Sequence, residues 1–161
     1  MLDVPILIAW HSRTGASEAL AKAVHEGARG SAVLMRAEAV LPEHLLAAQG
    51  YVFVCPENLA TMSGEMKEMF DRCYYPVLGE VEGRPYASVI AAGSDGEGAQ
   101  RQLDRIVTGW RMRRIADPMI VNFAAQTEQA ILAQKTVPEN YLIACDQLGN
   151  TFKEGLEIGL F

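Results

Sequence analysis

The clearest indication of the fold is the segment Val4-Pro5-Ile6-Leu7-Ile8-Ala9-Trp10, which is apolar throughout and does not alternate with polar residues. A continuous apolar run of strand length is typical of a strand that is buried on both faces, as in a parallel sheet covered by helices. The polar turn 11–16 follows, and apolar residues then recur at helical spacing over 17–28. These features predict a first β–α unit.

The same β–α pattern recurs along the rest of the chain. Short apolar runs predict further strands at 32–37, 51–55, 86–92 and 119–123. Between and after them, helical spacing predicts helices at 42–48, 99–113 and 138–157. Five strands that alternate with helices predict a doubly wound α/β sheet in one domain that spans residues 1–161.

Two segments differ from this simple strand–helix pattern. Residues 56–63 are predicted to be a loop, followed by a helix whose buried stripe is Met66, Met69, Phe70 and Cys73 and which should end by Pro76. Segment 124–137 has no clear periodicity, and residues 124–134 can be a short helix or a surface loop.

Composition and charge exclude several classes of function. The 161 residues are 50% hydrophobic and 21% charged, which fits one folded domain and excludes intrinsic disorder. With 14 Lys and Arg against 20 Asp and Glu, the net charge is −6, so we expect neither nucleic acid nor an anionic membrane as a partner. Every apolar run is far shorter than the roughly 20 residues of a membrane-spanning helix, so we expect no membrane insertion.

The cysteines and the N-terminus indicate a cellular compartment. Cys55, Cys73 and Cys145 are an odd number and lack CxxC spacing, which argues against a disulfide framework or a zinc site. No basic residue precedes the first apolar run, so we expect no secretory signal. Both observations favour the reducing cytoplasm.

The loops after the first, third and fourth predicted strands are the candidate ligand site. In an open parallel sheet, ligands bind beyond the carboxyl ends of the strands, where the strand order reverses. The first of these loops places the hydroxyls of Ser12, Thr14 and Ser17 around Gly15 at the start of a helix. Unpaired N–H groups at such a helix start favour a phosphate, whereas helix capping, the alternative explanation, requires only one hydroxyl.

Three motifs in these loops carry a resemblance to a known family. Ser12-Arg13-Thr14-Gly15-Ala16-Ser17 resembles the T/S-x-T-G-x-T/S phosphate loop of flavodoxin-like proteins. Residues 56–67, PENLATMSGEMK, are similar to a P-x-x-x-x-x-M-S/P-x-x-M-K stretch of NAD(P)H-dependent FMN reductases and Trp-repressor-binding-protein-type quinone reductases, and Phe70-Asp71-Arg72 continues that match. The turn 93–98 is similar to the Gly/Ser-rich turn after the fourth strand of that family.

The resemblance implies a flavodoxin-like fold with strand order 2-1-3-4-5 and a binding site for FMN. It also implies an oxidoreductase that takes electrons from NADH or NADPH and passes them to a quinone or another small-molecule acceptor. No catalytic side chain follows from it, because the flavin carries the chemistry. The implied cofactor-binding residues are Ser12, Arg13, Thr14, Gly15, Ala16, Ser17, Pro56, Glu57, Asn58, Leu59, Ala60, Thr61, Gly93, Ser94, Asp95 and Gly96.

Two alternatives to a reductase remain open. One is a flavodoxin-type electron carrier that docks on a redox protein, and the other is a scaffold that has lost its cofactor. The modest net charge and the absence of aromatic residues from 56–63 and 93–98 favour the reductase over the carrier. The hydroxyls retained in 12–17 argue against the scaffold.

Several other side chains have both a functional and a structural interpretation. His11, beside the phosphate loop, can assist proton transfer, or it can simply end the first strand. The resemblance implies a homo-oligomer, a dimer or a tetramer, to which Tyr74, Tyr75 and Trp110 can contribute if they are exposed. A cluster of arginines can recognise the 2′-phosphate of NADPH or an acidic partner, although a solvated helix face is the favoured interpretation: Arg101, Arg105, Arg111, Arg113 and Arg114.

Overall fold

A computed structural model describes residues 5–161, so Val4, the first residue of the predicted first strand, lies outside the described residues. The sheet has the hydrogen-bonded order β2-β1-β3-β5, and two further segments, β6 and β7, both pair with β5. All of these pairs are parallel. Because β5 and β7 are the predicted fourth and fifth strands, the expected order 2-1-3-4-5 is confirmed. The strands are β1 (Ile6–Trp10), β2 (Ala32–Arg36), β3 (Gly50–Asn58), β5 (Pro85–Ala92), β6 (Arg113–Arg114) and β7 (Met119–Asn122).

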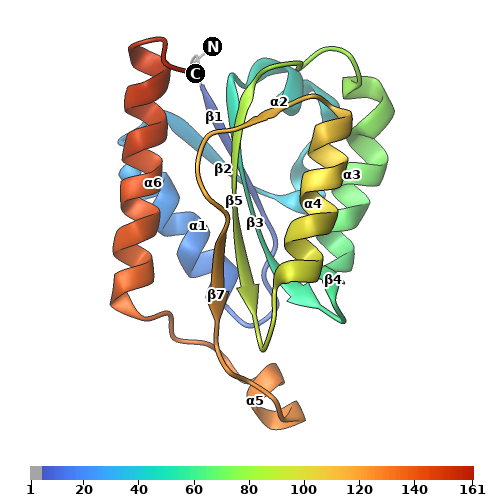
Figure 1. Cartoon of the computed structure of the whole chain (residues 1–161), viewed down its shortest axis with the longest axis vertical. Helices are drawn as coiled ribbons and strands as arrows, with labels where there is room; N and C mark the ends of the chain where they lie inside the picture. Colours follow the sequence, from blue (N-terminus) through green and yellow to red (C-terminus); the bar gives the residue numbers. More distant parts are fainter. Residues whose placement is uncertain (1–4) are drawn as a thin grey trace.

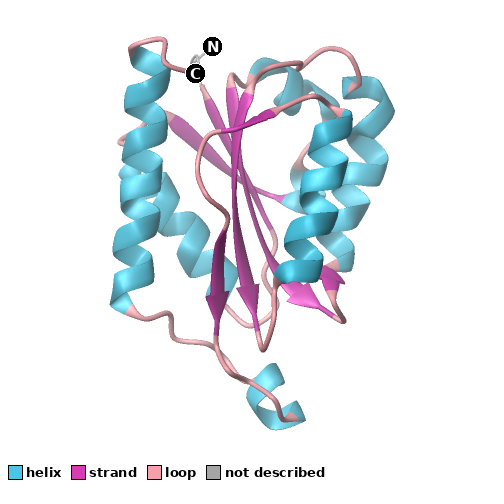
Figure 2. Ribbon diagram, in the orientation of Figure 1, coloured by secondary structure: helices cyan, strands magenta, loops and turns pink. Residues whose placement is uncertain are grey.

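Helices cover both faces of the sheet, as a doubly wound fold requires (Figures 1 and 2). One face carries α1 (Ala16–Gly27) and α6 (Glu139–Glu157). The other face carries α2 (Pro42–Ala47), α3 (Gly64–Val77) and α4 (Glu97–Gly109). Most observed bounds lie within one or two residues of the predicted ones, which is the ordinary uncertainty of element ends.

The hydrophobic core has two halves, one on each face of the sheet. Leu7 of β1 packs with Phe53, Phe70 and other residues on the side of α3 and α4. Ile8, the next residue, belongs to the half on the side of α1 and α6. Successive strand residues face opposite sides of a sheet, so a strand between two helix layers buries all of its side chains. This explains the continuous apolar run from which the fold was predicted.

The predicted loop 56–63 is instead a β-hairpin that extends beyond the sheet. Strand β3 continues to Asn58, and β4 (Thr61–Met62) pairs with it in the antiparallel sense. The two residues at the tip, Leu59 and Ala60, have φ angles of +52° and +66°. Two-residue hairpin turns with positive φ usually contain Asn and Gly. Leu-Ala lacks that signal, so the hairpin was not predicted.

Two helix ends differ from the prediction for local reasons. Helix α3 runs one residue past Pro76 to the buried Val77, because a proline in the last turn removes only one helical hydrogen bond. Helix α4 ends at Gly109 rather than at 113. The arginines beyond it, Arg113 and Arg114, pair with the start of β5 as β6.

The aromatic cluster predicted for a dimer contact is mostly buried. Trp110 is fully buried, and its Nε1 donates a hydrogen bond to the carbonyl oxygen of Tyr74 at 2.9 Å. The half-buried Tyr74 ring stacks on the indole, with ring centroids 5.7 Å apart. Only Tyr75 is exposed, at 79%. The expectation that all three rings lie on the surface is therefore wrong, because Trp110 packs back against α3.

None of the helices within 5–161 is long and apolar enough to cross a lipid bilayer. The three cysteines are buried and unbonded to one another. In this part of the chain, no group of three or more His, Cys, Asp and Glu side chains is arranged to hold a metal ion.

Candidate functional site

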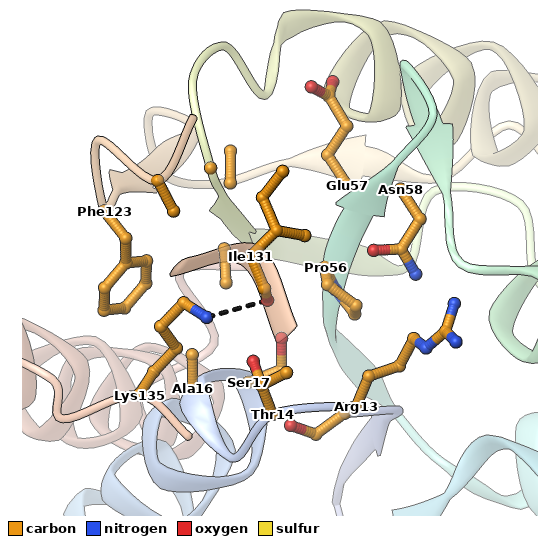
Figure 3. Close-up of a pocket in the computed structure, with 15 residues that line it drawn as sticks. Arg13, Thr14, Ala16, Ser17, Pro56, Glu57, Asn58, Phe123, Ile131 and Lys135 are labelled. Carbon is orange, nitrogen blue, oxygen red and sulfur yellow. Dashed lines mark hydrogen bonds between the residues drawn. The ribbon is translucent and has the colours of Figure 1, made fainter. Parts of the chain in front are cut away.

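A cavity opens at the carboxyl ends of β1, β3 and β5, where the strand order reverses (Figure 3). It encloses about 60 Å³, whereas sites for drug-sized ligands enclose about 300–1,000 Å³. The enclosed part therefore suits one small group of a larger ligand. The cavity is lined by Ser12, Arg13, Thr14, Ala16, Ser17, Pro56, Glu57, Asn58, Ala91, Ala92, Gly93, Phe123, Ala125, Ile131 and Lys135.

The phosphate-loop motif forms one wall of this cavity and has the chemistry of an anion site. Gly15 is the N-cap of α1 with a φ of +90°, and no side chain caps the helix. The hydroxyl of Ser12 instead accepts the Gly15 N–H at 3.1 Å. The first amides of α1 thus remain available to an anion, which the helix dipole also favours.

Ser17 supplies an independent sign that the cavity is a ligand site. Its side chain is buried, at 1% exposure, and its hydroxyl has no hydrogen-bond partner within residues 5–161. A buried hydroxyl without a partner costs free energy, and such groups are rare in folded proteins. Because Ser17 lines the cavity, a phosphate oxygen in the cavity would accept a hydrogen bond from the Ser17 hydroxyl.

The second predicted segment divides into residues that line the cavity and residues that do not. Pro56, Glu57 and Asn58 line it, as expected from the resemblance. Leu59, Ala60 and Thr61 lie at or beyond the hairpin tip, outside the lining, and Leu59 is 99% exposed.

Glu57 has a structural role that was not predicted. Its carboxylate accepts the backbone N–H groups of Gly96 at 2.9 Å and Ala99 at 3.0 Å. The side chain therefore caps α4, and Figure 3 shows its carboxylate turned away from the middle of the cavity. This contact fixes the hairpin against the start of α4.

In the third predicted segment, only Gly93 lines the cavity. A Cβ atom at Gly93 would lie 2.9 Å from the carbonyl oxygen of Ala125, so a side chain would not fit without a shift. Gly96 is the N-cap of α4 with a φ of +96°. Ser94 and Asp95 are exposed in the turn between them, outside the lining.

Sequence reasoning missed the side of the cavity formed by residues 123–135. Phe123, Ala125, Ile131 and Lys135 line it, together with Ala91 and Ala92 at the end of β5. This segment contains the short helix α5 (Glu128–Leu132), in which the Thr127 hydroxyl accepts the N–H of Ala130 at 3.2 Å. The short helix left open as an alternative for 124–134 is therefore confirmed over 128–132, where Thr followed by Glu is an N-cap signal. Nothing local indicates where this helix docks.

Two cations line the cavity without a carboxylate partner. Neither Arg13 nor Lys135 forms an ion pair with any side chain of 5–161. The only carboxylate in the lining, that of Glu57, is engaged by backbone amides of α4. These charges add to the helix dipole and favour an anionic ligand.

His11 lies next to this loop but does not line the cavity. It is buried, its Nδ1 lies 2.8 Å from the Ser63 hydroxyl, and its Nε2 lies 3.5 Å from a Glu65 carboxylate oxygen. Burial lowers the pKa of the imidazole, and the nearby Glu65 charge only partly offsets this. The arrangement supports the structural interpretation, in which His11 ties the end of β1 to the start of α3.

The predicted arginine cluster is divided between two environments. Arg114 pairs with Asp104 and lies over the ring of Tyr86, so it has a structural role. Arg101 and Arg105 instead line a groove on α3 and α4, together with Lys67, Gly98, Gln102 and Ile106.

Comparisons with known proteins identify the family of the chain. The family described as NADPH-dependent FMN reductase matches residues 36–126. A protein named flavodoxin from Aquifex aeolicus (strain VF5) is 27% identical over 162 residues, which cover 95% of this chain and 87% of that protein.

Solved structures share the fold. A flavodoxin from the domain Archaea superposes with a TM-score of 0.74 at 18% identity, over 94% of this chain and 98% of that one. A flavodoxin, WrbA-like protein from Agrobacterium tumefaciens gives a TM-score of 0.69 at 16% identity, over 92% and 94% of the two chains. The family match covers more than half of the 161 residues. The chain therefore belongs to the NADPH-dependent FMN reductase family and has its flavodoxin-like fold.

Proposed function

We propose that this protein holds FMN with its phosphate group in the cavity at the start of α1 and catalyses electron transfer from NADH or NADPH to a quinone or another small acceptor. The observation that carries the proposal is the hydroxyl of Ser17, which has no hydrogen-bond partner among the described residues and is buried beside the first amides of α1. Bound FMN would supply the hydride and electron chemistry that the side chains of the site lack.

The chain's own residues bind and orient the cofactor. The loop 12–17 provides hydroxyls and backbone amides for a phosphate, which cannot extend far into the sheet because the cavity is small. Pro56 and Asn58 border one side of the cavity (Figure 3), and Gly93 also lines it. Glycine and the exposed backbone of these loops allow close approach of a flat ring, which amide N–H groups can then contact.

A basic groove on α3 and α4 favours a phosphorylated donor. Arg101 and Arg105 lie one helical turn apart and form no ion pairs with residues 5–161, while Lys67 pairs with Asp71 at 2.5 Å. The groove has a volume of about 420 Å³. It lies next to the hairpin, since the N–H of Met62 donates to the Gln102 side chain at 2.8 Å. Guanidinium groups suit phosphates, so this groove is the proposed site for the 2′-phosphate of NADPH.

The proposal extends to a cytoplasmic homo-oligomer. Leu59 at the hairpin tip and Ile131 and Leu132 on α5 are exposed apolar side chains near the cavity. A second subunit that covers them would complete an apolar acceptor pocket, as the resemblance implies. Analytical ultracentrifugation tests this part separately.

An electron carrier is the second candidate function, and the curated relative named flavodoxin supports it. Steady-state oxidation of NADH and NADPH by the FMN-loaded protein, with and without a soluble quinone, separates the two candidates. A reductase consumes either nucleotide rapidly only when the quinone is present. A carrier binds FMN but leaves both nucleotides unoxidised until a partner reductase is added.

A further inference from the structure

The segment 124–137 crosses the phosphate loop. The backbone N–H of Lys135 donates to the carbonyl oxygen of Thr14 at 2.8 Å, and at the other end the N–H of Ala125 donates to Gly93 at 2.7 Å. The Gln134 side chain lies close to Gly15. A Cβ atom added at Gly15 would be only 2.0 Å from the Nε2 atom of Gln134. The segment is thus fitted to the loop that is proposed to hold the phosphate.

The middle of this segment is weakly packed. Helix α5 has no buried residue, and Ile131 and Leu132 are 50% and 61% exposed. The buried apolar side chains of 124–137 lie toward its two ends, at Ala125 and Val137. A helix with so little buried apolar surface belongs to the least stable parts of a fold. The position of α5 therefore depends on the anchored ends of the segment and on any ligand beneath it.

Lys135 is the charged residue of this segment that faces the cavity. Its Nζ donates to the carbonyl oxygens of Ala130, Ile131 and Ala133 at 2.8, 2.9 and 2.6 Å. These bonds hold the ammonium at the C-terminal end of α5, and Figure 3 shows it pointing inward above Ala16 and Ser17. The three carbonyl oxygens accept the three N–H groups of the ammonium. They carry no full negative charge, so the positive charge of Lys135 is not neutralised by a carboxylate of residues 5–161.

Arg13, the other cation of the lining, is placed differently. Figure 3 shows its guanidinium extending toward Asn58, away from Lys135. Arg13 is exposed to solvent, whereas Lys135 is half-buried. Screening by water weakens the exposed charge more than the partly buried one.

We propose that Lys135 makes the site selective for a phosphorylated flavin, because its half-buried ammonium faces the phosphate cavity from the overlying segment 124–137. A phosphate dianion beneath it gains a favourable charge interaction and holds the segment against the loop. Riboflavin lacks the phosphate, so it neither interacts with the Lys135 charge nor holds the segment against the loop. This inference rests on the proposed function, since it assigns a residue to the proposed FMN site.

The test is a fluorescence titration of the flavin-free full chain with FMN and, separately, with riboflavin. The variants are Lys135→Met, which removes the charge, and Lys135→Arg, which keeps it. Lys22→Met is the matched control, because Lys22 lies on α1 in an exposed ion pair with Glu18 at 2.9 Å. Circular dichroism verifies that each variant is folded.

We expect Lys135→Met to weaken FMN binding about tenfold to hundredfold, the range of a lost interaction with a charged group. Its riboflavin affinity should stay within about twofold of the wild type, which is a small difference in binding free energy. Lys135→Arg should retain most of the preference for FMN, and Lys22→Met should retain all of it. Added salt should reduce the preference for FMN over riboflavin more in the wild type than in Lys135→Met.

Two results would overturn the inference while leaving the proposed function intact. One is an unchanged FMN affinity in Lys135→Met. The other is an equal loss of affinity for FMN and for riboflavin, which would mean that Lys135 only stabilises the conformation of α5. If the wild type binds neither flavin, the proposed function fails, and this inference fails with it.

Discussion

The carboxylate of Glu57 accepts the backbone N–H of Ala99 at 3.0 Å, so a residue at the end of β3 caps helix α4. The same carboxylate accepts the N–H of Gly96 at 2.9 Å. Glu57 thereby joins the hairpin to the turn after β5, the two segments that are proposed to border the flavin ring.

Replacing Glu57 should therefore affect both stability and binding. Glu57→Ala leaves the first amides of α4 without their side-chain acceptor, and we expect a loss of about 1–2 kcal/mol in the free energy of unfolding. Urea denaturation without flavin measures this. Glu18→Ala, in the first turn of α1, is the control, because its carboxylate pairs with Lys22 and not with backbone amides. It should cost less than half as much; equal losses would contradict the capping role.

Replacing Ser17 should change stability and cofactor affinity in opposite directions. Ser17→Ala removes a buried hydroxyl that has no partner, so the flavin-free protein should become about 1 kcal/mol more stable. FMN affinity should fall at the same time, because a phosphate ligand is lost. Thermal unfolding and FMN titration of the same preparation measure the two effects, and a fall in both quantities would argue that the hydroxyl has another partner.

The stability of the flavin-free protein should depend on the protonation of His11. Burial holds the pKa of His11 below its ordinary value of about 6.5, so the unfolded chain binds the proton more readily than the folded one. Stability should therefore fall as the pH drops through 6.5 towards the lowered pKa. Urea midpoints between pH 5 and 8 measure this slope.

A substitution at His11 tests that assignment. His11→Asn should be less stable at every pH, since the contact with Ser63 is altered, but its slope in this window should be smaller. An unchanged slope in His11→Asn would assign the titration to another group.

The groove on α3 and α4 should distinguish the two pyridine nucleotides. In the double variant Arg101→Gln and Arg105→Gln, we expect the KM for NADPH to rise about tenfold, with kcat and the KM for NADH within about twofold of the wild type. Arg111→Gln with Arg113→Gln is the matched control, because both of those residues are also exposed. If the KM values for both nucleotides stay unchanged, Arg101 and Arg105 do not bind the nucleotide and only form a solvent-exposed helix face.

Much of the fold could be predicted because its signals are local. The apolar run 6–10 identified a strand buried on both faces, and the hydroxyl-rich turn 12–17 predicted the position of the start of α1, which is the proposed phosphate site. The position of Lys135 could not be predicted, because its contact with Thr14 joins residues far apart in the sequence. The burial of Trp110 was missed for the same reason, since it depends on the Tyr74 carbonyl of another helix.

The central claim is that the start of α1 holds the phosphate of FMN, and a titration of the flavin-free protein with FMN tests it most directly. The account predicts that one FMN binds per chain and gives a yellow complex. Thr14→Asp, which places a carboxylate against the phosphate, should weaken binding at least about a hundredfold, while the neutral Thr14→Asn should weaken it far less. A wild-type protein that is colourless after incubation with FMN and removal of the unbound flavin by desalting would contradict the account. A Thr14→Asp variant that binds as tightly as the wild type would also contradict it.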